Sequence, residues 1–144
     1  MQFDLATARQ FAAEGKLETW IHAYLLGGGW ANPGLLDGLK LQRRWWVGPV
    51  EVPLTALTRC CGPEPAMEFC MSPEAWEKRV NALAGSLVSL ADVPPLIVQY
   101  RAGVYSIRDG NHRHEAMRRK GWRTCWIVIW YDDAESWHSS PYKT

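Results

Sequence analysis

The first part of the chain has apolar residues at the spacing typical of helices. Between Leu5 and Leu26 the sequence is rich in Ala, Leu, Glu and Lys, and its apolar residues recur along one helical face. Gly15 is expected to divide this stretch into two helices, and the glycines at 27–29 to end the second. Because no strand precedes these glycines, we interpret them as a helix end and a flexible joint and not as a phosphate loop. A third, short helix is expected over 35–41.

A longer helix is predicted after a loop rich in Pro and Gly. Ser72 is a favourable N-cap, and Pro73 occupies the first helical position. The apolar residues that follow fall on one face of this helix: Trp76, Val80, Leu83, Leu87 and Leu90. We therefore expect a helix that extends to about residue 90.

Four stretches have the pattern of strands. Residues 95–100 and 104–109 flank a tight turn and predict a hairpin. The segment "CWIVIWY" at 125–131 is apolar throughout, so we expect a central strand that is covered on both faces. A shorter strand is expected at 50–52.

The junction between the hairpin and the next helix is the strongest candidate site. A helix is expected over 111–120, and Gly121 ends it. The N-terminus of a helix presents free backbone N–H groups and the positive end of the helix dipole, which together bind anions. Gly110 lets the backbone approach a bound group closely. The sequence "DGNHR" at this junction therefore predicts a phosphate site.

The side chains of "DGNHR" add chemistry to this site. Arg113 can hold two phosphate oxygens at once, and His112 can hydrogen-bond a phosphate or transfer a proton. Asp109 either caps the helix or holds a metal ion. In a purely structural interpretation, Asp109 is only a cap and the basic residues form a solvated helix face. His114 is expected to be such an exposed residue. We favour a function for the junction, because its turn, dipole and charge agree.

Composition and charge limit the classes of protein that fit. The chain has 144 residues, of which 47% are hydrophobic, and this is the size and composition of one globular domain. Its formal net charge is +1, so phosphate or nucleic-acid binding needs a local patch. Residues 101–123 provide one, with a net charge of +5 from seven basic and two acidic residues: Arg101, Arg108, Arg113, Arg118, Arg119, Lys120 and Arg123 against Asp109 and Glu115.

The nine tryptophans are expected mainly in the core. Trp45, Trp46, Trp126 and Trp130 lie in apolar stretches. The other five fit either a core position or a surface for a nucleotide or partner: Trp20, Trp30, Trp76, Trp122 and Trp137.

A zinc site and membrane insertion are not expected. The four cysteines, Cys60, Cys61, Cys70 and Cys125, form no C-x-x-C pair. His112 and His114 are two residues apart and are poorly placed to share a metal on a helix. The chain has neither a signal peptide nor an apolar run of membrane length, so we expect a cytoplasmic protein with reduced thiols.

The order of elements and the turn together resemble a known superfamily. The segment "VPPLIVQYRAGVYSIRDGNHRHEAMRRKGWRTCWIVIW" is similar to the core of the ParB N-terminal/sulfiredoxin-like superfamily. In that core a hairpin leads through a "D/G-G-x-x-R" turn into a helix and then an apolar strand. The resemblance implies an α+β domain over 47–131, with a small mixed sheet and flanking helices. Residues 1–46 would be an N-terminal helical extension, and 132–144 a polar C-terminal tail.

The resemblance also implies a nucleotide or phosphate site at Gly110, Asn111, His112 and Arg113. Sulfiredoxins carry their nucleophilic Cys where this chain has Asn111, so sulfinic acid reduction is not expected. The chromosome-partition members continue into a helix-turn-helix domain, for which we expect no room after the last strand. The free serine kinases have the most similar turn, "D-G-H-x-R". Their glutamate base lies in the loop where this chain has Glu64 and Glu68.

Two hypotheses of function follow. The first is a phosphotransferase or nucleotide hydrolase acting on ATP, ADP, CTP or a phosphorylated small molecule. In it Asp109 positions Mg²⁺ or the accepting hydroxyl, His112 contacts the transferred group, and Glu64 or Glu68 is the base. The second is a non-enzymatic module that binds a nucleotide, or a nucleic-acid backbone without sequence specificity, and acts through partner contacts. The oligomeric state and the role of residues 1–46, as a lid or a cover for the sheet, stay open.

Overall fold

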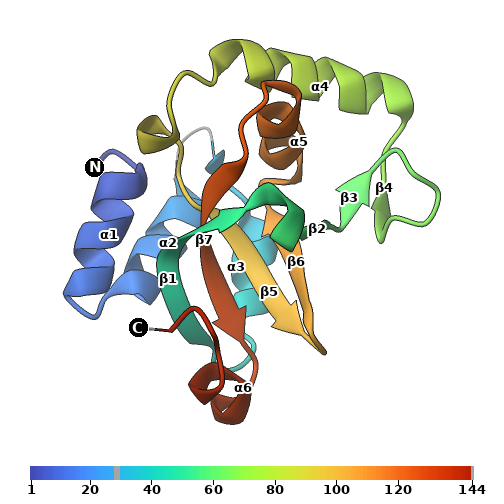
Figure 1. Ribbon diagram of the computed structural model, residues 1–144. Coiled ribbons are helices and arrows are strands. Elements are labelled where there is room, and N and C mark those ends of the chain that lie inside the picture. The colour runs from blue at the N-terminus through green and yellow to red at the C-terminus, as the bar shows by residue number, and fades with distance from the viewer. Residues whose placement is uncertain (28–29, 144) are drawn as a thin grey trace.

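A five-stranded mixed sheet forms the centre of the computed structural model, which describes residues 1–27 and 30–143 (Figure 1). The strands pair in the order β1-β7-β5-β6-β2. β5 is parallel to β7 and antiparallel to β6, β1 is antiparallel to β7, and β2 is parallel to β6. The strand bounds are β1 Trp45–Pro53, β2 Thr58–Arg59, β5 Leu96–Arg101, β6 Val104–Asp109 and β7 Thr124–Tyr131. A separate parallel pair is formed by β3 (Cys61–Gly62) and β4 (Phe69–Cys70).

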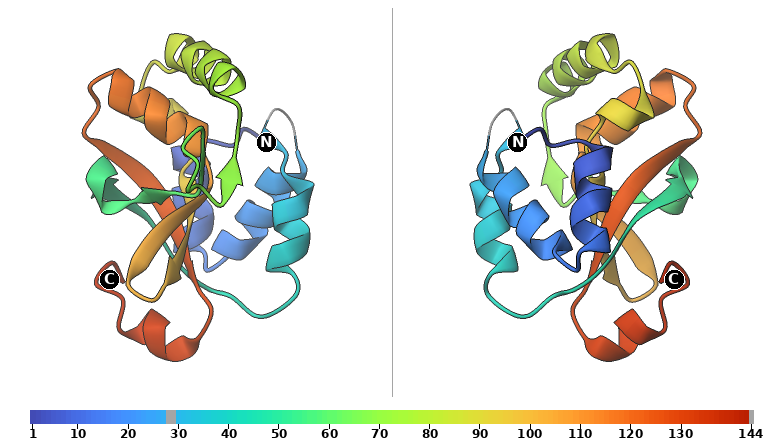
Figure 2. Two further views of the ribbon diagram at one scale, coloured as in Figure 1. Left: turned by 90° about the vertical axis from the view of Figure 1, so that its right-hand side faces the viewer. Right: turned by 90° about the vertical axis from the view of Figure 1, so that its left-hand side faces the viewer.

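Helices cover the two faces of this sheet (Figure 2). One face is covered by α1 (Leu5–Ala13), α2 (Leu17–Leu26) and α3 (Pro33–Leu39). The other is covered by α4 (Pro73–Ser86) and α5 (Asn111–Arg119). The remaining helical segments are η2 (Leu54–Ala56), η3 (Leu90–Asp92) and α6 (Ala134–His138). This arrangement confirms the predicted α+β class.

The central strands are buried on both sides, as the apolar run at 125–131 predicts. Successive side chains of a strand point to opposite faces. Accordingly, Ile127 and Ile129 pack in the cluster under α4 and α5, whereas Val128 and Trp130 pack in the cluster under α1, α2 and α3. Of the other tryptophans expected in the core, Trp45, Trp46 and Trp126 are only half-buried.

The N-terminal helices begin and end close to the predicted points. Gly15 has a φ of +74° and separates α1 from α2, as expected. Asp4 caps α1 by accepting a hydrogen bond from the Thr7 amide at 2.9 Å. α2 ends at Leu26. The prediction of a flexible joint concerns Gly28 and Gly29, which lie outside the described residues.

Two segments differ from the prediction. α4 ends at Ser86 and not near residue 90, because Leu87 takes an extended conformation, and the separate 3-10 helix η3 follows at Leu90–Asp92. The segment predicted as a polar tail contains α6, whose N-cap Asp133 accepts a hydrogen bond from the Ser136 amide at 2.7 Å. The indole of Trp137 in α6 then donates to the Trp46 carbonyl, so α6 packs against β1.

Within the described residues, no helix has both the length and the apolar character needed to cross a membrane.

The position of β7 at the centre of the core gives a stability prediction. Ile127 is fully buried, so Ile127→Ala should lower the free energy of unfolding by about 2 to 5 kcal/mol. Leu41, which is 84% exposed, is the control, and Leu41→Ala should change that free energy by less than about 0.5 kcal/mol. Urea unfolding measures both. Equal effects of the two variants would contradict the assignment of β7 to the core.

Candidate functional site

A groove of about 750 Å³ lies where β6 meets α5. Residues 108–113 form one part of its lining, and Cys60, Cys61 and β4 form another. α4 contributes Arg79 and Leu83, and the N-terminal segment contributes Trp30 and Leu35. The structure therefore brings Asp109, Gly110, Asn111, His112 and Arg113 together at one groove, and it does not bring Glu64 or Glu68 there.

The N-terminus of α5 has no side-chain cap. Its N-cap residue is Gly110, which has a φ of +106° and whose place no larger residue could take without a clash against the Leu96 side chain. The interpretation of Asp109 as the cap is therefore wrong. Counted from the start of α5, the first backbone N–H that donates a hydrogen bond is that of His114, whose acceptor is the Gly110 carbonyl at 2.9 Å. Within the described residues, the amides of 111–113 have no recorded acceptor.

Asp109 and Arg113 form a buried ion pair. Arg113 Nη2 lies 3.0 Å from Asp109 Oδ2, and the Arg113 side chain is 3% exposed. The same nitrogen donates to the Tyr24 hydroxyl at 2.9 Å, and that hydroxyl donates to Asp109 Oδ2 at 3.1 Å. Arg113 Nη1 donates to the Pro94 carbonyl at 2.7 Å. The guanidinium predicted to grip a phosphate thus has several partners inside the protein.

The N-terminal segment completes this buried cluster. Burial raises the pKa of Tyr24 above its ordinary value, so its hydroxyl stays protonated and continues to donate to Asp109. Asn32 Nδ2 approaches Asp109 Oδ1 at 3.4 Å. The Trp30 ring lies over the guanidinium of Arg113, at 4.7 Å from its centroid. Residues 1–46 therefore do more than cover the sheet: they hold two residues of the predicted site.

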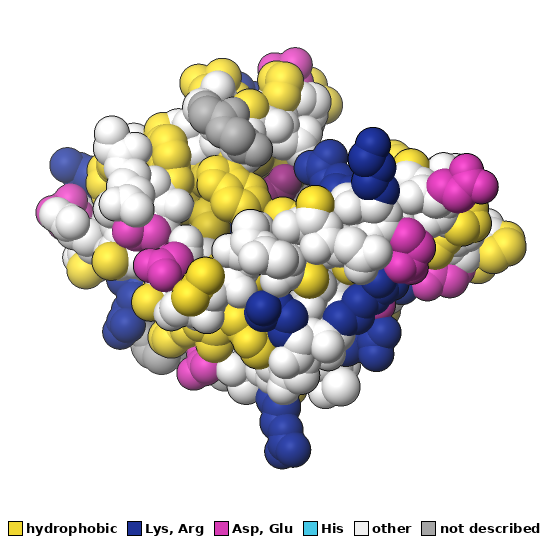
Figure 3. Space-filling view, turned by 90° about the horizontal axis from the view of Figure 1, so that it is seen from above, with side chains coloured by type: hydrophobic (Ala, Val, Ile, Leu, Met, Phe, Trp, Pro, Cys, Tyr) yellow, Lys and Arg dark blue, Asp and Glu magenta, His cyan; other side chains and the backbone are white. Residues whose placement is uncertain are grey.

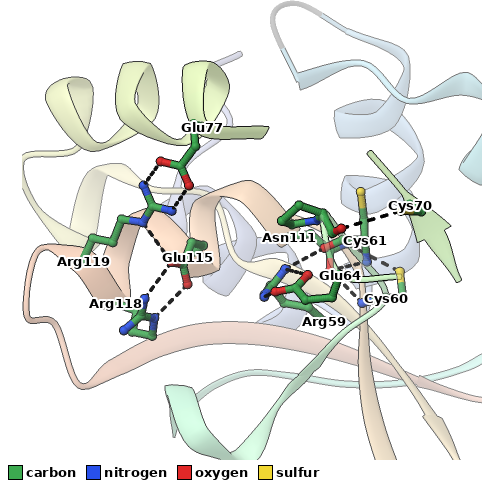
Figure 4. A network of polar contacts seen from close by, with 11 residues as sticks. Arg59, Cys60, Cys61, Glu64, Cys70, Glu77, Asn111, Glu115, Arg118 and Arg119 are labelled. Carbon is green, nitrogen blue, oxygen red and sulfur yellow. Dashed lines mark hydrogen bonds and ion pairs between the residues drawn. The ribbon is translucent and has the colours of Figure 1, made fainter. Parts of the chain in front are cut away.

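The side chain of Asn111 is engaged in the protein interior. Its Oδ1 accepts hydrogen bonds from the amides of Cys60 at 2.9 Å and Cys61 at 3.3 Å, and its Nδ2 donates to the Ile107 carbonyl at 3.2 Å (Figure 4). The side chain fastens the segment after β2 to the start of α5. For a bound anion, Asn111 offers its backbone N–H and not its amide side chain.

His112 is uncharged at neutral pH. Its ring packs against Trp76 with 4.6 Å between centroids, and its Nε2 lies 3.2 Å from Met71 Sδ. Burial, aided by Arg79 and Arg59, lowers the pKa of His112 to about 4. The imidazole can hydrogen-bond a ligand, but it is far from the pKa that suits proton transfer near pH 7.

His114 is buried and not exposed, which corrects the sequence-based expectation. Its Nε2 lies 2.9 Å from the Leu54 carbonyl, so the ring connects α5 to η2. Met117, one helical turn after His114, is also buried. The two side chains therefore lie on the same face of α5, which packs toward the core.

The two candidate bases form ion pairs, one of them with Arg108 at the edge of the groove. Glu64 Oε1 lies 2.6 Å from Arg59, and Glu68 Oε2 lies 2.8 Å from Arg108. These hydrogen bonds lower the pKa of both carboxyl groups, which weakens them as bases. Both side chains are about half exposed, and neither lines the groove.

Ion pairs to two acidic residues outside the segment, Glu68 and Glu77, lower the net charge of the 101–123 cluster from +5 to +3. Arg118 and Arg119 both bind Glu115, at 2.7 and 2.8 Å, and Arg119 also binds Glu77 of α4 at 2.6 Å (Figure 4). Arg108 and Arg113 have the acidic partners described above. Basic and acidic side chains are interspersed on the face seen in Figure 3. The ion pairs of Arg119 therefore connect α5 to α4, whereas Arg101, Lys120 and Arg123 are exposed and have no ion pair among the described residues.

The groove contains two residues that the sequence analysis did not assign to the site. Arg79 lies three residues after Trp76 on α4, and this spacing places both on the side of the helix that faces α5. Phe69 is 56% exposed and belongs to β4, a short strand in a Pro- and Gly-rich segment whose sequence gives no sign of contact with α5. Only the folded chain brings these segments together.

Solved structures similar to this chain include the following two. Sulfiredoxin from Arabidopsis thaliana has a TM-score of 0.44 and 26% identity, and the match covers 62% of this chain and 92% of that one. The Pnob8-like ParB-N domain has a TM-score of 0.39 and 16% identity, and the match covers 67% of this chain and 33% of that one. Sulfiredoxin and the ParB-N domain are the two kinds of protein after which the superfamily resembled by the sequence is named, and both TM-scores lie below 0.5, so neither likeness carries an argument about this chain. No protein-family model and no curated protein matches the chain.

The buried amide of Asn111 generates a stability prediction. In Asn111→Ala the amides of Cys60 and Cys61 lose their acceptor, which should lower the free energy of unfolding by about 1 to 3 kcal/mol. Hydrogen exchange at both amides should become faster. Asn81→Ala, on the exposed surface of α4, is the control and should leave the exchange unchanged. Unchanged protection of Cys60 in Asn111→Ala would show that Asn111 does not hold this segment.

Glu115 generates a prediction about acid stability. Its hydrogen bonds to Arg118, more than those to Arg119, lower its pKa to about 2 in the folded protein. A carboxyl with a depressed folded pKa stabilises the fold above its unfolded pKa of about 4.3, and this contribution disappears as the pH falls toward 2. Glu115→Gln should therefore be less stable than the wild type at pH 7, and the difference should narrow toward pH 2. Urea unfolding at pH 7, 4 and 2.5 measures this.

The exposed carboxylate of Glu14 is the control for this measurement. Glu14→Gln should have a stability close to that of the wild type at each pH. A constant gap between Glu115→Gln and the wild type across the three pH values would rule out the role of this carboxylate.

Proposed function

We propose that the groove binds the phosphate group of a nucleotide or of another phosphorylated small molecule. The observation that carries the proposal is the uncapped N-terminus of α5, because residues 110–113 line the groove and the amides of 111–113 have no recorded acceptor within the described residues. Such amides and the helix dipole favour an anion. The size of the groove is in the range of sites for small molecules.

Two arginines support this location for a phosphate. Arg79 is exposed, lines the groove, and has no recorded ion pair within residues 1–27 and 30–143. Arg108 binds Glu68 through Nη1, but its buried Nε has no hydrogen-bond partner among the described residues. This nitrogen is shielded from the groove, but the Arg108 side chain lines the groove and adds a second positive charge close to the start of α5.

The same contacts favour binding over phosphoryl transfer. Asp109 already accepts hydrogen bonds from Tyr24 and Arg113, and His112 is uncharged near pH 7. Glu64 and Glu68 do not line the groove, and each is held in an ion pair, Glu68 with the groove residue Arg108. No side chain at the groove is therefore a ready general base, and we place the phosphotransferase hypothesis second. The described residues include no obvious catalyst at the groove. Incubation of the protein with ATP and Mg²⁺ should therefore give no product.

The donor set does not suit a metal held by the protein. Among the described residues no group of three or more metal-ligating side chains comes together. Asp109 is the one carboxylate among the described residues of the groove, and Arg113 already balances its charge. In a nucleotide–Mg²⁺ complex the ion would therefore be held by the phosphates and water.

A mononucleotide fits this groove better than a nucleic-acid backbone. Backbone binding depends on several free Lys and Arg side chains along a surface. Here Arg108, Arg113, Arg118 and Arg119 all have acidic partners. We therefore propose a small ligand and not a polymer.

Arg79→Gln tests the proposed site. Removal of a charge-assisted hydrogen bond should weaken the binding of ATP and of inorganic tripolyphosphate by about tenfold or more. Isothermal titration calorimetry measures both affinities. Arg123→Gln is the matched control, because Arg123 is an exposed arginine outside the groove, and it should bind like the wild type.

Two results would overturn the proposed function. One is that the wild type binds neither tripolyphosphate nor ATP, ADP or CTP. The other is that Arg79→Gln and Arg108→Gln both bind these ligands with wild-type affinity.

A further inference from the structure

A second, smaller cavity of about 250 Å³ lies beside the hairpin of β5 and β6, at the end of the sheet away from α5 (Figure 1). Its lining comes from β5, β6, β7 and the C-terminal segment that contains α6. No described residue lines both this cavity and the groove at α5. Sites for drug-sized ligands measure roughly 300 to 1,000 Å³, so this cavity suits a smaller group.

Three tyrosines line this cavity, and the register of the sheet places them in a row. Tyr100 of β5 is paired with Tyr105 of β6. The parallel pairing of β5 with β7 reaches Gln99 and Trp130, so Tyr100 and Tyr131 come next in that register. Paired residues of neighbouring strands point to the same face of a sheet. Accordingly, the centroid of the Tyr100 ring lies 5.1 Å from that of Tyr105 and 5.2 Å from that of Tyr131.

The rings of this tyrosine cavity are held in place but carry no cation. The Tyr131 hydroxyl is hydrogen-bonded with Ser140 of the C-terminal segment and lies 3.4 Å from the Tyr105 hydroxyl. Among the described residues, each Lys or Arg that lies over an aromatic ring lies over a tryptophan and not over one of these tyrosines. The faces of the three rings are therefore left for a group from outside the chain.

The charge of the tyrosine cavity favours a cation. Glu135 is the one charged side chain among its described lining residues, and it is exposed and has no ion pair in that part of the chain. The faces of aromatic rings are also negative, so an anion would be repelled. A bare metal ion lacks ligands here, because no group of three metal-ligating side chains occurs within residues 1–27 and 30–143.

We propose that the tyrosine cavity binds a quaternary or methylated ammonium group. Its methyl groups pack against the tyrosine rings, and its positive charge is attracted by the rings and by Glu135. The unmodified ammonium of lysine is compact and strongly hydrated, so it costs more to remove from water. The inference is independent of the phosphate site and gives the chain a second class of ligand.

A matched pair of small molecules tests the role of the charge. Choline carries a trimethylammonium group, and its neutral carbon isostere carries a tert-butyl group of the same shape. In NMR titrations of the ¹⁵N-labelled full chain, choline should shift the amide resonances of Ser136 and Ser140 until they saturate. The isostere should bind about tenfold more weakly, because it lacks the charge that the rings attract. Equal affinities would overturn the proposal.

Variants of the lining residues test the location. Tyr100→Ala should weaken choline binding about tenfold, whereas Tyr100→Phe keeps the ring and should bind like the wild type. Glu135→Gln removes an exposed charge and should weaken binding about two- to fivefold. Trp126→Ala and Glu14→Gln are the controls, a half-buried aromatic residue and an exposed carboxylate outside the cavity, and both should bind like the wild type.

Circular dichroism confirms that each variant is folded. If Tyr100→Ala does not fold, Glu135→Gln and the comparison of choline with its isostere decide. Unchanged choline affinity in folded Tyr100→Ala would overturn the proposal.

Two peptides distinguish a free small molecule from a protein side chain as the source of the ammonium group. One short peptide carries a trimethylated lysine, and the other has the same sequence with unmodified lysine. Tighter binding of choline identifies a small molecule, and tighter binding of the trimethylated peptide identifies a modified partner protein. The unmodified peptide should bind more weakly than the trimethylated one. Equal binding of the two peptides, or no shifts with either choline or the trimethylated peptide, would contradict the proposal.

Discussion

The groove depends on the buried ion pair between Asp109 and Arg113. A buried charge is costly unless it is paired and hydrogen-bonded, so the guanidinium must find its partners for the chain to fold. Those partners come from three places: the end of β6, the carbonyl of Pro94 before β5, and the hydroxyl of Tyr24 in α2. One side chain thus fixes the position of α5, the hairpin and the N-terminal helices relative to one another.

This arrangement decides which groups remain for a ligand. The charged side chains of "DGNHR" and the amide of Asn111 are engaged inside the protein. What faces the groove freely is the backbone at the start of α5, together with Arg79 from α4. The turn that looked like a set of catalytic side chains therefore acts mainly as a rigid frame for backbone donors. A frame of this kind suits recognition of a phosphate better than its transfer.

Local signals in the sequence predicted most of the elements. Gly15, the N-cap Ser72 and the apolar run at 125–131 act within a few residues, so their effects can be predicted without the fold. The sequence also predicted that 109–113 would share one site. It could not predict the burial of His114 or the ion pairs of the glutamates, because these contacts join residues that are distant in sequence. The presence of Trp30 and Phe69 at the same groove could not be predicted for the same reason.

Backbone NMR tests the central claim most directly, since it observes the amides themselves. Titration of the ¹⁵N-labelled chain with inorganic tripolyphosphate should shift the amide resonances of Asn111, His112 and Arg113 more than those of the C-terminal half of α5. The shifts should saturate at a single affinity. If these three resonances stay in place while the anion binds, or if the largest shifts occur at residues away from the groove, α5 does not hold the phosphate and the account is wrong.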